Sequence, residues 1–495
     1  MRQKFSLLIL ALVMVCSAVF LPSCGKGPDT PTDTDPPTTS GENTHPRDAY
    51  LAQIPVKDFE GEDFVIASPT RAWAHMEMTA DAYTADAIND VIFERTMNVE
   101  ARLNLHLVDH MVQTPGVAAY TRNDVLSGLG SYDLLVVYPN DALIYYQEGL
   151  YVDQNTIENI DFSRPWWENG FNDEVNVGSS RYVTYNQSNL SLYSGFYIYA
   201  FNKSLVESYG LESPYDLVSS NSWTWDKVYE MMKAVTTDAD GDGSASPKDG
   251  DTFGLVGHVN HSMNLMLSSG VTIADRDEER NIVFRGITEA YTNAFEKYTN
   301  YFIASNECRI SGRGGMFTGY TSTSGLADYI SYFNDGKALF MTTGTSEVAK
   351  LRQSAVEYGI VVVPKYDSSQ SEFITPVYKS VDGYAIPKNA QAVMEDTALV
   401  LETICAYSYG SIVDTHIGTV LHYRAAKDPI AKEMIDLAYS NPIIDVCLAN
   451  NFGGCSSTIL SLNQSGNPST TELKSLNRMI LGAIEEAQNP GAKDG

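Results

Sequence analysis

The sequence is poor in the residues and motifs that carry catalysis or metal chemistry. Its 495 residues include only six cysteines and eight histidines, and neither type recurs at the spacing of a metal site. Gly-x-Ser-x-Gly, His-Glu-x-x-His, a Walker loop and a dinucleotide fingerprint are all missing. We therefore expect a protein that is not an enzyme.

Basic residues are also scarce. Lys and Arg together number 33 against 62 Asp and Glu, which gives a formal net charge of −29 at pH 7. A surface this acidic repels nucleic acid and anionic lipid headgroups. We expect no nucleic-acid partner and a body that stays off the membrane surface.

Cysteines are too few and too scattered for a disulfide scaffold. After the N-terminal region, only Cys308, Cys405, Cys447 and Cys455 remain. Cys447 and Cys455 either pair across a Gly-containing loop or stay unpaired and buried.

The longest apolar run is too short to cross a bilayer. It extends from Phe5 to Phe20, whereas a spanning helix needs about 20 apolar residues. Arg2 and Lys4 precede it, and Ser23 follows as a small residue before a cut. This arrangement predicts a secretory signal in residues 1–23 rather than a transmembrane anchor.

Cys24 ends that signal in the run Leu21-Pro22-Ser23-Cys24. The pattern Leu-x-Ser-Cys followed by Gly resembles a bacterial lipobox. The resemblance implies that Cys24 becomes the first mature residue and carries lipid, such as palmitate, on its sulfur. Such anchoring is stable when at least two acyl chains contribute, at about 0.8 kcal/mol per buried methylene. We expect a lipoprotein on the outer face of the cell membrane.

The segment after Cys24 is rich in Pro, Thr, Asp and Gly up to about Arg47. Such a composition builds no core and predicts an extended, flexible tether. We assign residues 24–57 to this linker and expect the folded part to begin near Asp58.

The remainder alternates short apolar strands with amphipathic helices. This order predicts an α/β fold with a mainly parallel sheet covered on both faces. Thr224 is the expected N-cap of one helix. Strands are expected at 62–68, 105–108, 132–139, 196–201, 338–342 and 360–364, and helices at 88–103, 225–235, 393–407 and 430–439.

Several segments together resemble the family 1 extracellular solute-binding proteins of bacterial ABC importers, the group that includes maltose-binding proteins. The resemblance runs over roughly 63–445. It rests on Val91-Ile-Phe-Glu-Arg-Thr-Met-Asn-Val-Glu100, Tyr132-Asp-Leu-Leu-Val-Val, Tyr199-Ala-Phe-Asn-Lys203, Trp223-Thr-Trp-Asp226, Phe333-Asn-Asp-Gly-Lys-Ala-Leu-Phe340 and Tyr358-Gly-Ile-Val-Val-Val-Pro-Lys365.

The resemblance implies a two-lobed, type II periplasmic-binding-protein-like fold with a ligand cleft between the lobes. The chain would cross near 191–195 and return near 377–383. Lobe 1 would comprise 58–193 plus 379–425, and lobe 2 would comprise 194–378 plus 426–489 with the C-terminal helices. Such a monomer captures a carbohydrate, closes around it and delivers it to an ABC-type permease.

The rule that ligands of α/β sheets lie beyond the carboxyl ends of strands points to the loops after the first and third strands. The resemblance implies the candidates at the crossings and in lobe 2. Sugars also need aromatic platforms and hydrogen-bonding groups. The loops after the first and third strands, the two crossings and the facing loops of lobe 2 supply such groups. The candidates are Ser68, Arg71, Trp73, Tyr138, Asn140, Asp141, Trp167, Tyr193, His258, Gly344, Tyr378 and Asp382.

Each candidate also has a structural interpretation. Trp73 is a platform or part of the lobe surface, and Tyr138 is a ligand contact or strand-end core. Asn140 and Asp141 contact ligand or cap a helix, and Trp167 contacts ligand or anchors the turn after Pro165. Where maltose-binding relatives carry a stacking Trp after Asn-Gly-Pro, this chain has Gly344-Thr-Ser346, which argues against a maltodextrin ligand.

One acidic loop has the ligand spacing of a calcium site. Asp238, Asp240 and Asp242 occupy positions one, three and five, Gly243 permits the turn at six, and Asp249 occupies twelve. Ser244 would supply its carbonyl at seven. This is the spacing of an EF-hand-type Ca²⁺ loop, and the alternative is a solvated acidic turn. Because residues 251–256 are strand-like, we expect a structural ion rather than a signalling one.

Two other functions remain open at this point. A sensor or adhesin on the same fold would pass ligand occupancy to a partner other than an importer. A surface glycosidase would need paired carboxylates, which 62 acidic residues supply anywhere by chance. The identity of the sugar and of the permease does not follow from the sequence.

Overall fold

The computed structural model describes residues 46–70, 78–113, 116–243, 246–312, 328–348, 350–351, 354–388 and 394–489. Of the residues singled out above, Cys24, Arg71, Trp73 and Ser244 lie outside these ranges. The described residues belong to one compact unit. No helix among them is long and apolar enough to cross a bilayer.

The first sheet has four strands in the order β12-β3-β1-β2. β1 pairs in parallel with β2 and β3, and β12 runs antiparallel to β3. The strands are β1 (Glu62–Pro69), β2 (Leu105–Val112), β3 (Leu134–Val137) and β12 (Gly383–Ala385).

Helices cover both faces of this sheet. Alternate residues of a strand point to opposite faces, and β3 shows this directly. Leu134 and Val136 pack in one core with α2 and α14, whereas Leu135 and Val137 pack in the other with α3 and α4. These helices are α2 (Ala87–Leu103), α3 (Val117–Ser127), α4 (Pro139–Gln147) and α14 (Met394–Ser408).

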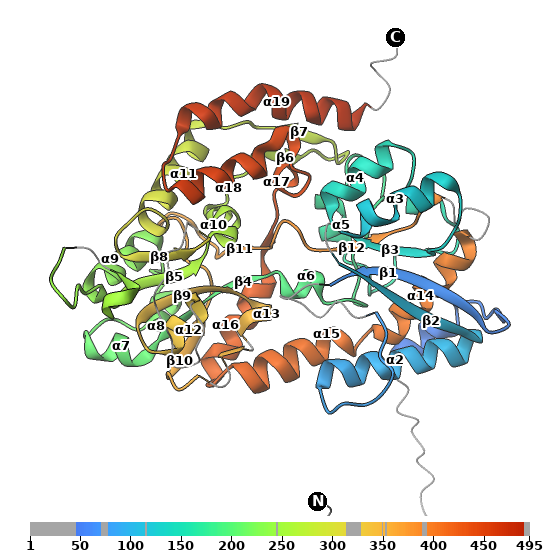
Figure 1. Ribbon diagram of the computed structural model, residues 1–495, viewed down its shortest axis with the longest axis horizontal. Helices are drawn as coiled ribbons and strands as arrows, with labels where there is room; N and C mark the ends of the chain where they lie inside the picture. Colours follow the sequence, from blue (N-terminus) through green and yellow to red (C-terminus); the bar gives the residue numbers. More distant parts are fainter. Residues whose placement is uncertain are drawn as a thin grey trace, which may run out of the picture. The chain divides into compact units, whose positions relative to one another are not determined.

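The second sheet has five strands in the order β10-β4-β9-β5-β8. β5 is parallel to β8 and β9, while β4 runs antiparallel to β9 and β10. The strands are β4 (Tyr197–Asn202), β5 (Phe253–His258), β8 (Cys308–Ser311), β9 (Ala338–Gly344) and β10 (Tyr358–Val361). In Figure 1 this sheet lies to the left and the first sheet to the right, with α6 between them.

Both faces of the second sheet are covered as well. Phe253 contacts the ring of Tyr332 in α12 at a centroid distance of 5.6 Å. The next residue, Gly254, faces α9 so closely that an added Cβ would lie 2.3 Å from the Cβ of Met232. The surrounding helices are α7 (Lys203–Ser208), α8 (Pro214–Ser219), α9 (Trp225–Val235), α10 (Val259–Leu265), α11 (Glu289–Phe302), α12 (Tyr329–Asn334), α13 (Thr345–Val348) and α16 (Pro429–Ser440).

Two segments connect the sheets side by side. The short helix α6 (Ser191–Ser194) leads into β4, and the returning chain runs from Val377 to β12. An antiparallel bridge joins Phe196 to Val377. The backbone N–H of Asp382 also donates to the Ser191 hydroxyl at 2.5 Å. These are the two crossings expected from the sequence. Past α14, the chain continues through α15 (Ile412–Asp414) and the π-helix η6 (Thr415–Ala425) to α16.

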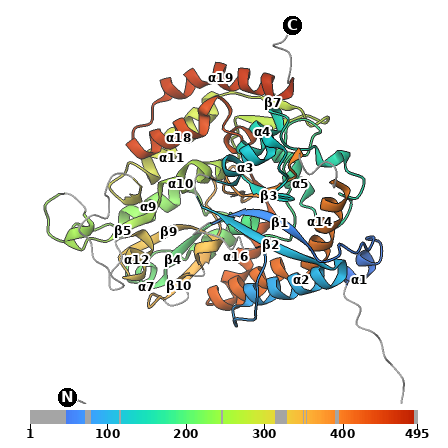
Figure 2. The same cartoon turned by 45° about the vertical axis from the view of Figure 1, so that its right-hand side comes forward.

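The C-terminal elements cover one end of the second sheet's helical layer. Helix α19 lies beside α18 and α11 in both views (Figures 1 and 2). These elements are β11 (Thr375–Pro376), β13 (Pro442–Ile443), α17 (Val446–Ala449), α18 (Cys455–Ser465) and α19 (Thr470–Gln488), with the hairpin β6 (Ala274–Arg276) and β7 (Ile282–Phe284). The shorter pieces are α5 (Asn169–Val175), η1 (Gln154–Thr156), η2 (Pro247–Asp249), η3 (Met266–Ser269) and η7 (Phe452–Gly454).

Most expected elements are present, although β2, β3 and β10 begin or end up to four residues from their expected bounds. The folded part begins before Asp58, because α1 (Pro46–Leu51) precedes the first strand. Leu51 and Ile54 are buried in the core of the first sheet, and the Arg102 guanidinium donates to both of their carbonyls at 2.8 Å. The linker therefore ends before the predicted residue 57. Two isolated apolar side chains in an otherwise polar segment are enough to pack that segment against the core.

The sheets also contain more antiparallel pairing than expected. β12, β4 and β10 run against their neighbours, although their apolar sequences look like those of the parallel strands. All three are buried on both faces, so apolar pattern alone does not distinguish the two directions.

Candidate ligand-binding site

A cavity of about 240 Å³ lies at the carboxyl ends of β5 and β9. β5 ends at His258 and β9 ends at Gly344. Because β4 is antiparallel to β9, its first residue, Tyr197, pairs with Gly344 at the same edge. The lining residues are Ser194, Gly195, Tyr197, His258, Asn260, His261, Tyr329, Gly344, Ser346, Glu347 and Tyr378.

Three residues predicted from the sequence meet in this cavity. His258 and Gly344 reach it from the two parallel strands, and Tyr378 reaches it from the return crossing. The imidazole of His258 caps α10, with Nδ1 accepting from the backbone N–H of Asn260 at 3.1 Å. These three residues are far apart in the sequence, and the family resemblance implied their place at the cleft.

Glu347 is a lining residue that the sequence analysis missed. Its Oε2 accepts from the Tyr329 hydroxyl at 2.7 Å and from the Thr343 hydroxyl at 3.4 Å. The side chain is 15% exposed. Glu347 directly follows the predicted segment 343–346, and this position was the one indication of a role at the site. Nothing in the local sequence distinguishes it from the other acidic residues of the chain.

Two histidines lie beside Glu347. Nε2 of His261 is 3.8 Å from Glu347 Oε2, and the rings of His258 and His261 are 5.8 Å apart. Burial lowers the pKa of His258, and it lowers the pKa of His261 to about 4 against the opposing effect of Glu347. Both imidazoles are therefore neutral at pH 7.

A second cavity of about 230 Å³ brings together the three predicted residues that follow β3. Tyr138 follows β3 and precedes α4, whose first turn carries Asn140 and Asp141. The lining residues are Tyr138, Asn140, Asp141, Lys379, Ser380, Ala449, Asn451, Ser456, Ser457 and Leu460. Tyr378 lines the first cavity and Lys379 the second, so the return crossing contributes to both.

Lys379 was not among the sequence-predicted residues. Its ammonium group donates to the Ser380 hydroxyl at 3.1 Å, and its backbone N–H donates to Oδ1 of Asn264 at 3.1 Å. Burial lowers the pKa of Lys379, while Cys455 and Asp141 act in the opposite direction. A lysine in a crossing segment gives no local signal in the sequence.

Four predicted ligand residues lie in structural contacts and line neither cavity. The Ser68 hydroxyl donates to the carboxylate of Asp109. Trp167 is 4% exposed and donates from Nε1 to Glu402 at 3.2 Å. This placement fits the turn-anchor interpretation of Trp167, because burial leaves no ring face for a sugar.

The other two of these four lie at the crossings. Tyr193 is buried in α6 and its hydroxyl donates to Glu168, while Asp382 is fully buried beside Ser191. Both were predicted to contact ligand because they lie at the crossings. The two crossing segments pack against each other, however, and this packing buries both side chains.

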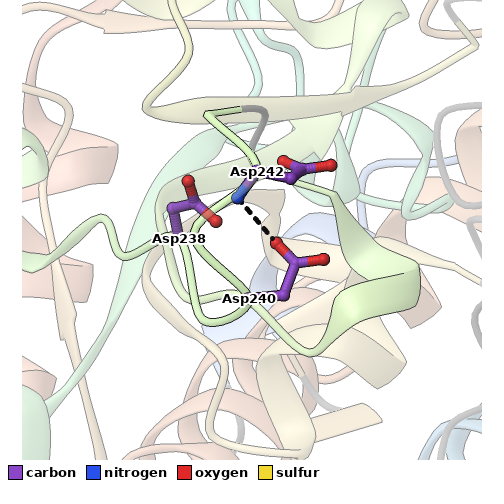
Figure 3. A group of neighbouring side chains, drawn as sticks. All are labelled: Asp238, Asp240 and Asp242. Carbon is purple, nitrogen blue, oxygen red and sulfur yellow. Dashed lines mark hydrogen bonds between the residues drawn. The ribbon is translucent and has the colours of Figure 1, made fainter.

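The acidic loop brings three carboxylates together. Oxygen atoms of Asp238, Asp240 and Asp242 all lie within 4.8 Å of one another. Figure 3 shows them around one turn, where the backbone N–H of Asp242 donates to Asp240 Oδ1 at 3.2 Å. In the described part of the chain, Asp249 does not join this group.

Backbone contacts shape the same loop. Asp238 accepts from the N–H groups of Gly241 and Gly243 at 2.8 and 2.7 Å. The pKa of Asp238 is lowered, chiefly because its carboxylate accepts the hydrogen bond from the Gly243 amide. Asp251, which is fully buried, closes the base by accepting from Ala239 at 2.6 Å and from Ser246 at 2.5 Å. Three convergent carboxylates are the donor set that Ca²⁺ prefers.

The four described cysteines are buried, and Cys405, Cys447 and Cys455 are free thiols. Sγ of Cys455 donates to the carbonyl of Cys447 at 3.1 Å. Of the two alternatives for this pair, the structure has unpaired thiols.

Comparisons with known proteins show the fold. No protein-family model matches the sequence, and no curated protein matches it. A solved ABC substrate-binding protein of Listeria monocytogenes, in complex with cycloalternan, matches with a TM-score of 0.53 and 12% identity over 86% of this chain and 98% of that chain.

Two further solved structures agree. The GacH receptor of Streptomyces glaucescens, solved unliganded and with acarbose, has a TM-score of 0.54 and 10% identity over 86% of this chain and 98% of its own. The cyclic α-maltosyl-1,6-maltose binding protein of Arthrobacter globiformis has a TM-score of 0.53 and 13% identity over 88% and 99%. The expected two-lobed periplasmic-binding-protein-like fold is thereby confirmed.

Proposed function

We propose that this chain is a substrate-binding protein that captures a sugar or oligosaccharide and delivers it to an ABC-type permease. The observation that carries the proposal is the cavity at the carboxyl edge of β5 and β9, which the paired crossings border through Gly195 and Tyr378. A ligand held there would touch both the second sheet and the two crossings, the segments expected to act as hinges. Binding at that place couples occupancy to closure.

The chemistry of the cavity suits a carbohydrate. Tyr197, Tyr329 and Tyr378 offer aromatic surface for sugar rings, while Asn260, Ser346 and Glu347 offer hydrogen-bonding groups. Glycosidases use two carboxylates about 5–9.5 Å apart, whereas Glu347 is the one carboxylate among the described lining residues. The solved structures of similar fold include proteins that bind cycloalternan, acarbose and a cyclic maltosyl-maltose.

The N-terminal pattern supports a lipid-anchored form of this protein. Lipidation of Cys24 would hold the binding body on the outer face of the cell membrane, on a Pro- and Thr-rich tether. Tethering raises the effective concentration of a monomeric binding protein near its permease. Metabolic labelling with an alkyne fatty acid tests this, because a Cys24→Ser variant should lose the label and leave the membrane fraction. Labelling that persists in this variant would contradict the assignment.

We also propose that the loop from Asp238 to Asp249 holds a structural Ca²⁺. Asp238, Asp240 and Asp242 would supply carboxylate oxygens, with Ser244 as a predicted further ligand. Asp249, the other ligand predicted from the sequence, lies outside the group of three carboxylates. Extracellular modules bind Ca²⁺ with Kd values of about 10⁻⁴–10⁻³ M, so millimolar Ca²⁺ outside the cell would fill such a site. Its role would be to pin the loop between α9 and β5.

A binding screen tests the proposed function. The chain without residues 1–23 and with Cys24→Ser is tested by thermal shift against neutral sugars, oligosaccharides, peptides and polyols, and positives are measured by calorimetry. We expect a carbohydrate to raise Tm and to bind without turnover. Stabilisation by peptides alone, or hydrolysis of the sugar at enzymatic rates, would contradict the proposal.

A further inference from the structure

We propose that the carbohydrate in the first cavity carries an ammonium group, as an amino sugar does, and that Glu347 pairs with it inside a ring of aromatic side chains. This inference rests on the proposed function and adds the chemical class of the ligand.

Glu347 is a partly buried carboxylate with room for a cation. Oε2 is the oxygen that accepts from Tyr329 and Thr343. Among the described residues, Oε1 has no hydrogen-bond donor and no Lys or Arg lies within 4 Å of the carboxylate. Its nearest basic group, His261, lies at 3.8 Å and is neutral at pH 7. A carboxylate taken out of water is costly unless a cation pairs with it.

Several aromatic side chains line the same cavity as this carboxylate and lie close to one another. The ring of His261 lies 5.2 Å from that of Tyr197 and 6.0 Å from that of Tyr329, and His258 lies 6.3 Å from Tyr329. Tyr378 lines the same cavity. Burial, followed by the charge of Glu347, raises the pKa of Tyr329, which keeps this phenol neutral. Neutral aromatic faces beside a carboxylate form the arrangement that binds ammonium groups.

The charges of the cavity lining and of the whole chain also favour a cationic ligand. No Lys or Arg is found among the described residues that line this cavity, and Lys379 lines the other one. A formal net charge of −29 attracts cations and repels anions at long range. An anionic sugar would meet an unfavourable field, and a neutral sugar would leave the charge of Glu347 without a counter-charge.

Matched pairs of sugars test the inference by calorimetry at pH 7. Glucose, galactose and mannose are compared with their 2-amino-2-deoxy counterparts, and β-1,4-linked tetramers of glucosamine with those of N-acetylglucosamine. We expect roughly tenfold or tighter binding of at least one amine over its neutral counterpart, as for hydrogen bonds to charged groups. In Glu347→Gln this preference should fall to about twofold or less.

The possible outcomes separate the inference from the proposed function. Neutral sugars that bind as tightly as amines, or an amine preference that persists in Glu347→Gln, would overturn the inference and leave carbohydrate binding standing. Failure of every sugar in this panel and in the wider screen would contradict the proposed function itself. Glu372→Gln, an exposed substitution, should retain the preference and serves as the matched control.

Discussion

The backbone N–H of Tyr378 donates to the carbonyl of Gly195 at 2.8 Å, and this bond ties the two crossing segments together at the edge of the first cavity. Both residues line that cavity. The contact requires a close approach of the two backbones, which the missing side chain of Gly195 permits. The segments that connect the two sheets therefore also line the candidate ligand cavity.

A methyl group at position 195 should disturb this pairing. The Cβ of Gly195→Ala would lie 2.6 Å from Cγ1 of Val381 and 3.4 Å from Cβ of Tyr378. We expect the free energy of unfolding to fall by about 1–3 kcal/mol, as for overpacking in a core. Chemical denaturation measures the change, and calorimetry with the identified sugar should show weaker binding.

The matched control for that substitution is Gly482→Ala in the exposed face of α19. An added Cβ there meets nothing within 4 Å, and Ala is favoured over Gly in a helix by roughly 0.5–1 kcal/mol. This variant should be slightly more stable than the wild type. Equal behaviour of the two variants would contradict the steric account of Gly195.

The stability of the first sheet's core should depend on pH through Glu402. This buried carboxylate accepts from the indole N–H groups of Trp166 and Trp167 and from the backbone N–H of Asp161. Burial raises the pKa of Glu402 to about 7, although these donors and Arg164 oppose the shift. The folded protein therefore holds this proton more tightly than the unfolded chain.

The sign of the effect follows directly. The contribution of Glu402 to the free energy of unfolding is complete below its unfolded pKa near 4.5 and is lost as pH rises through about 7. The loss is of the order of 3 kcal/mol. Urea unfolding between pH 5 and 8 should show a decline in stability that is steeper in the wild type than in Glu402→Gln. Parallel pH profiles of the two proteins would contradict this.

Asp445 also makes the protein less stable as pH rises. The contribution of Glu402 must therefore be measured as the difference between the wild type and Glu402→Gln. Burial raises the pKa of Asp445 to about 6, against the hydrogen bonds that it accepts from the backbone of residues 273, 274, 447 and 448. Its contribution persists in Glu402→Gln, so the difference between the two proteins isolates Glu402.

Calcium removal should destabilise the loop between α9 and β5. At Ca²⁺ about tenfold above Kd, the gain in stability is about 1.4 kcal/mol, or roughly 1–2 °C in Tm for a chain of this size. We expect EGTA to lower Tm by that amount in the wild type. Asp240→Asn, which removes one exposed carboxylate, should show no response to EGTA.

An exposed carboxylate outside the loop provides the control for this measurement. Asp81→Asn should retain the wild-type response to EGTA. A Tm that EGTA leaves unchanged in the wild type, together with no bound calcium by elemental analysis, would refute the calcium proposal.

The sequence predicts those parts of the fold that depend on local pattern. Helix α9 begins at Trp225 as expected, because the Thr224 hydroxyl accepts from the N–H of Lys227 at 3.3 Å and apolar residues recur on one face. His258 and Gly344 were expected to face the ligand because of the family resemblance, which places their segments on the cleft side of the second lobe. Both line the first cavity.

Other parts of the site depend on contacts that no local pattern reveals. Trp167 and Tyr378 are both aromatic residues near polar turns, yet Glu402 holds Trp167 in the core, whereas Tyr378 lines a cavity. Glu347 gains its place from Tyr329 and Thr343, which come from other segments. Lys379 is distinguished only by the packing of the return crossing.

The measurement that tests the central claim most directly is carbohydrate binding to the wild type and to Gly344→Trp. The indole would enter the first cavity from the end of β9, where an added Cβ meets only ordinary contacts at 3.4 Å or more. We predict that the wild type binds a carbohydrate by calorimetry and that Gly344→Trp retains its Tm but loses this binding. Unchanged carbohydrate affinity in a folded Gly344→Trp protein would contradict the assignment of this cavity.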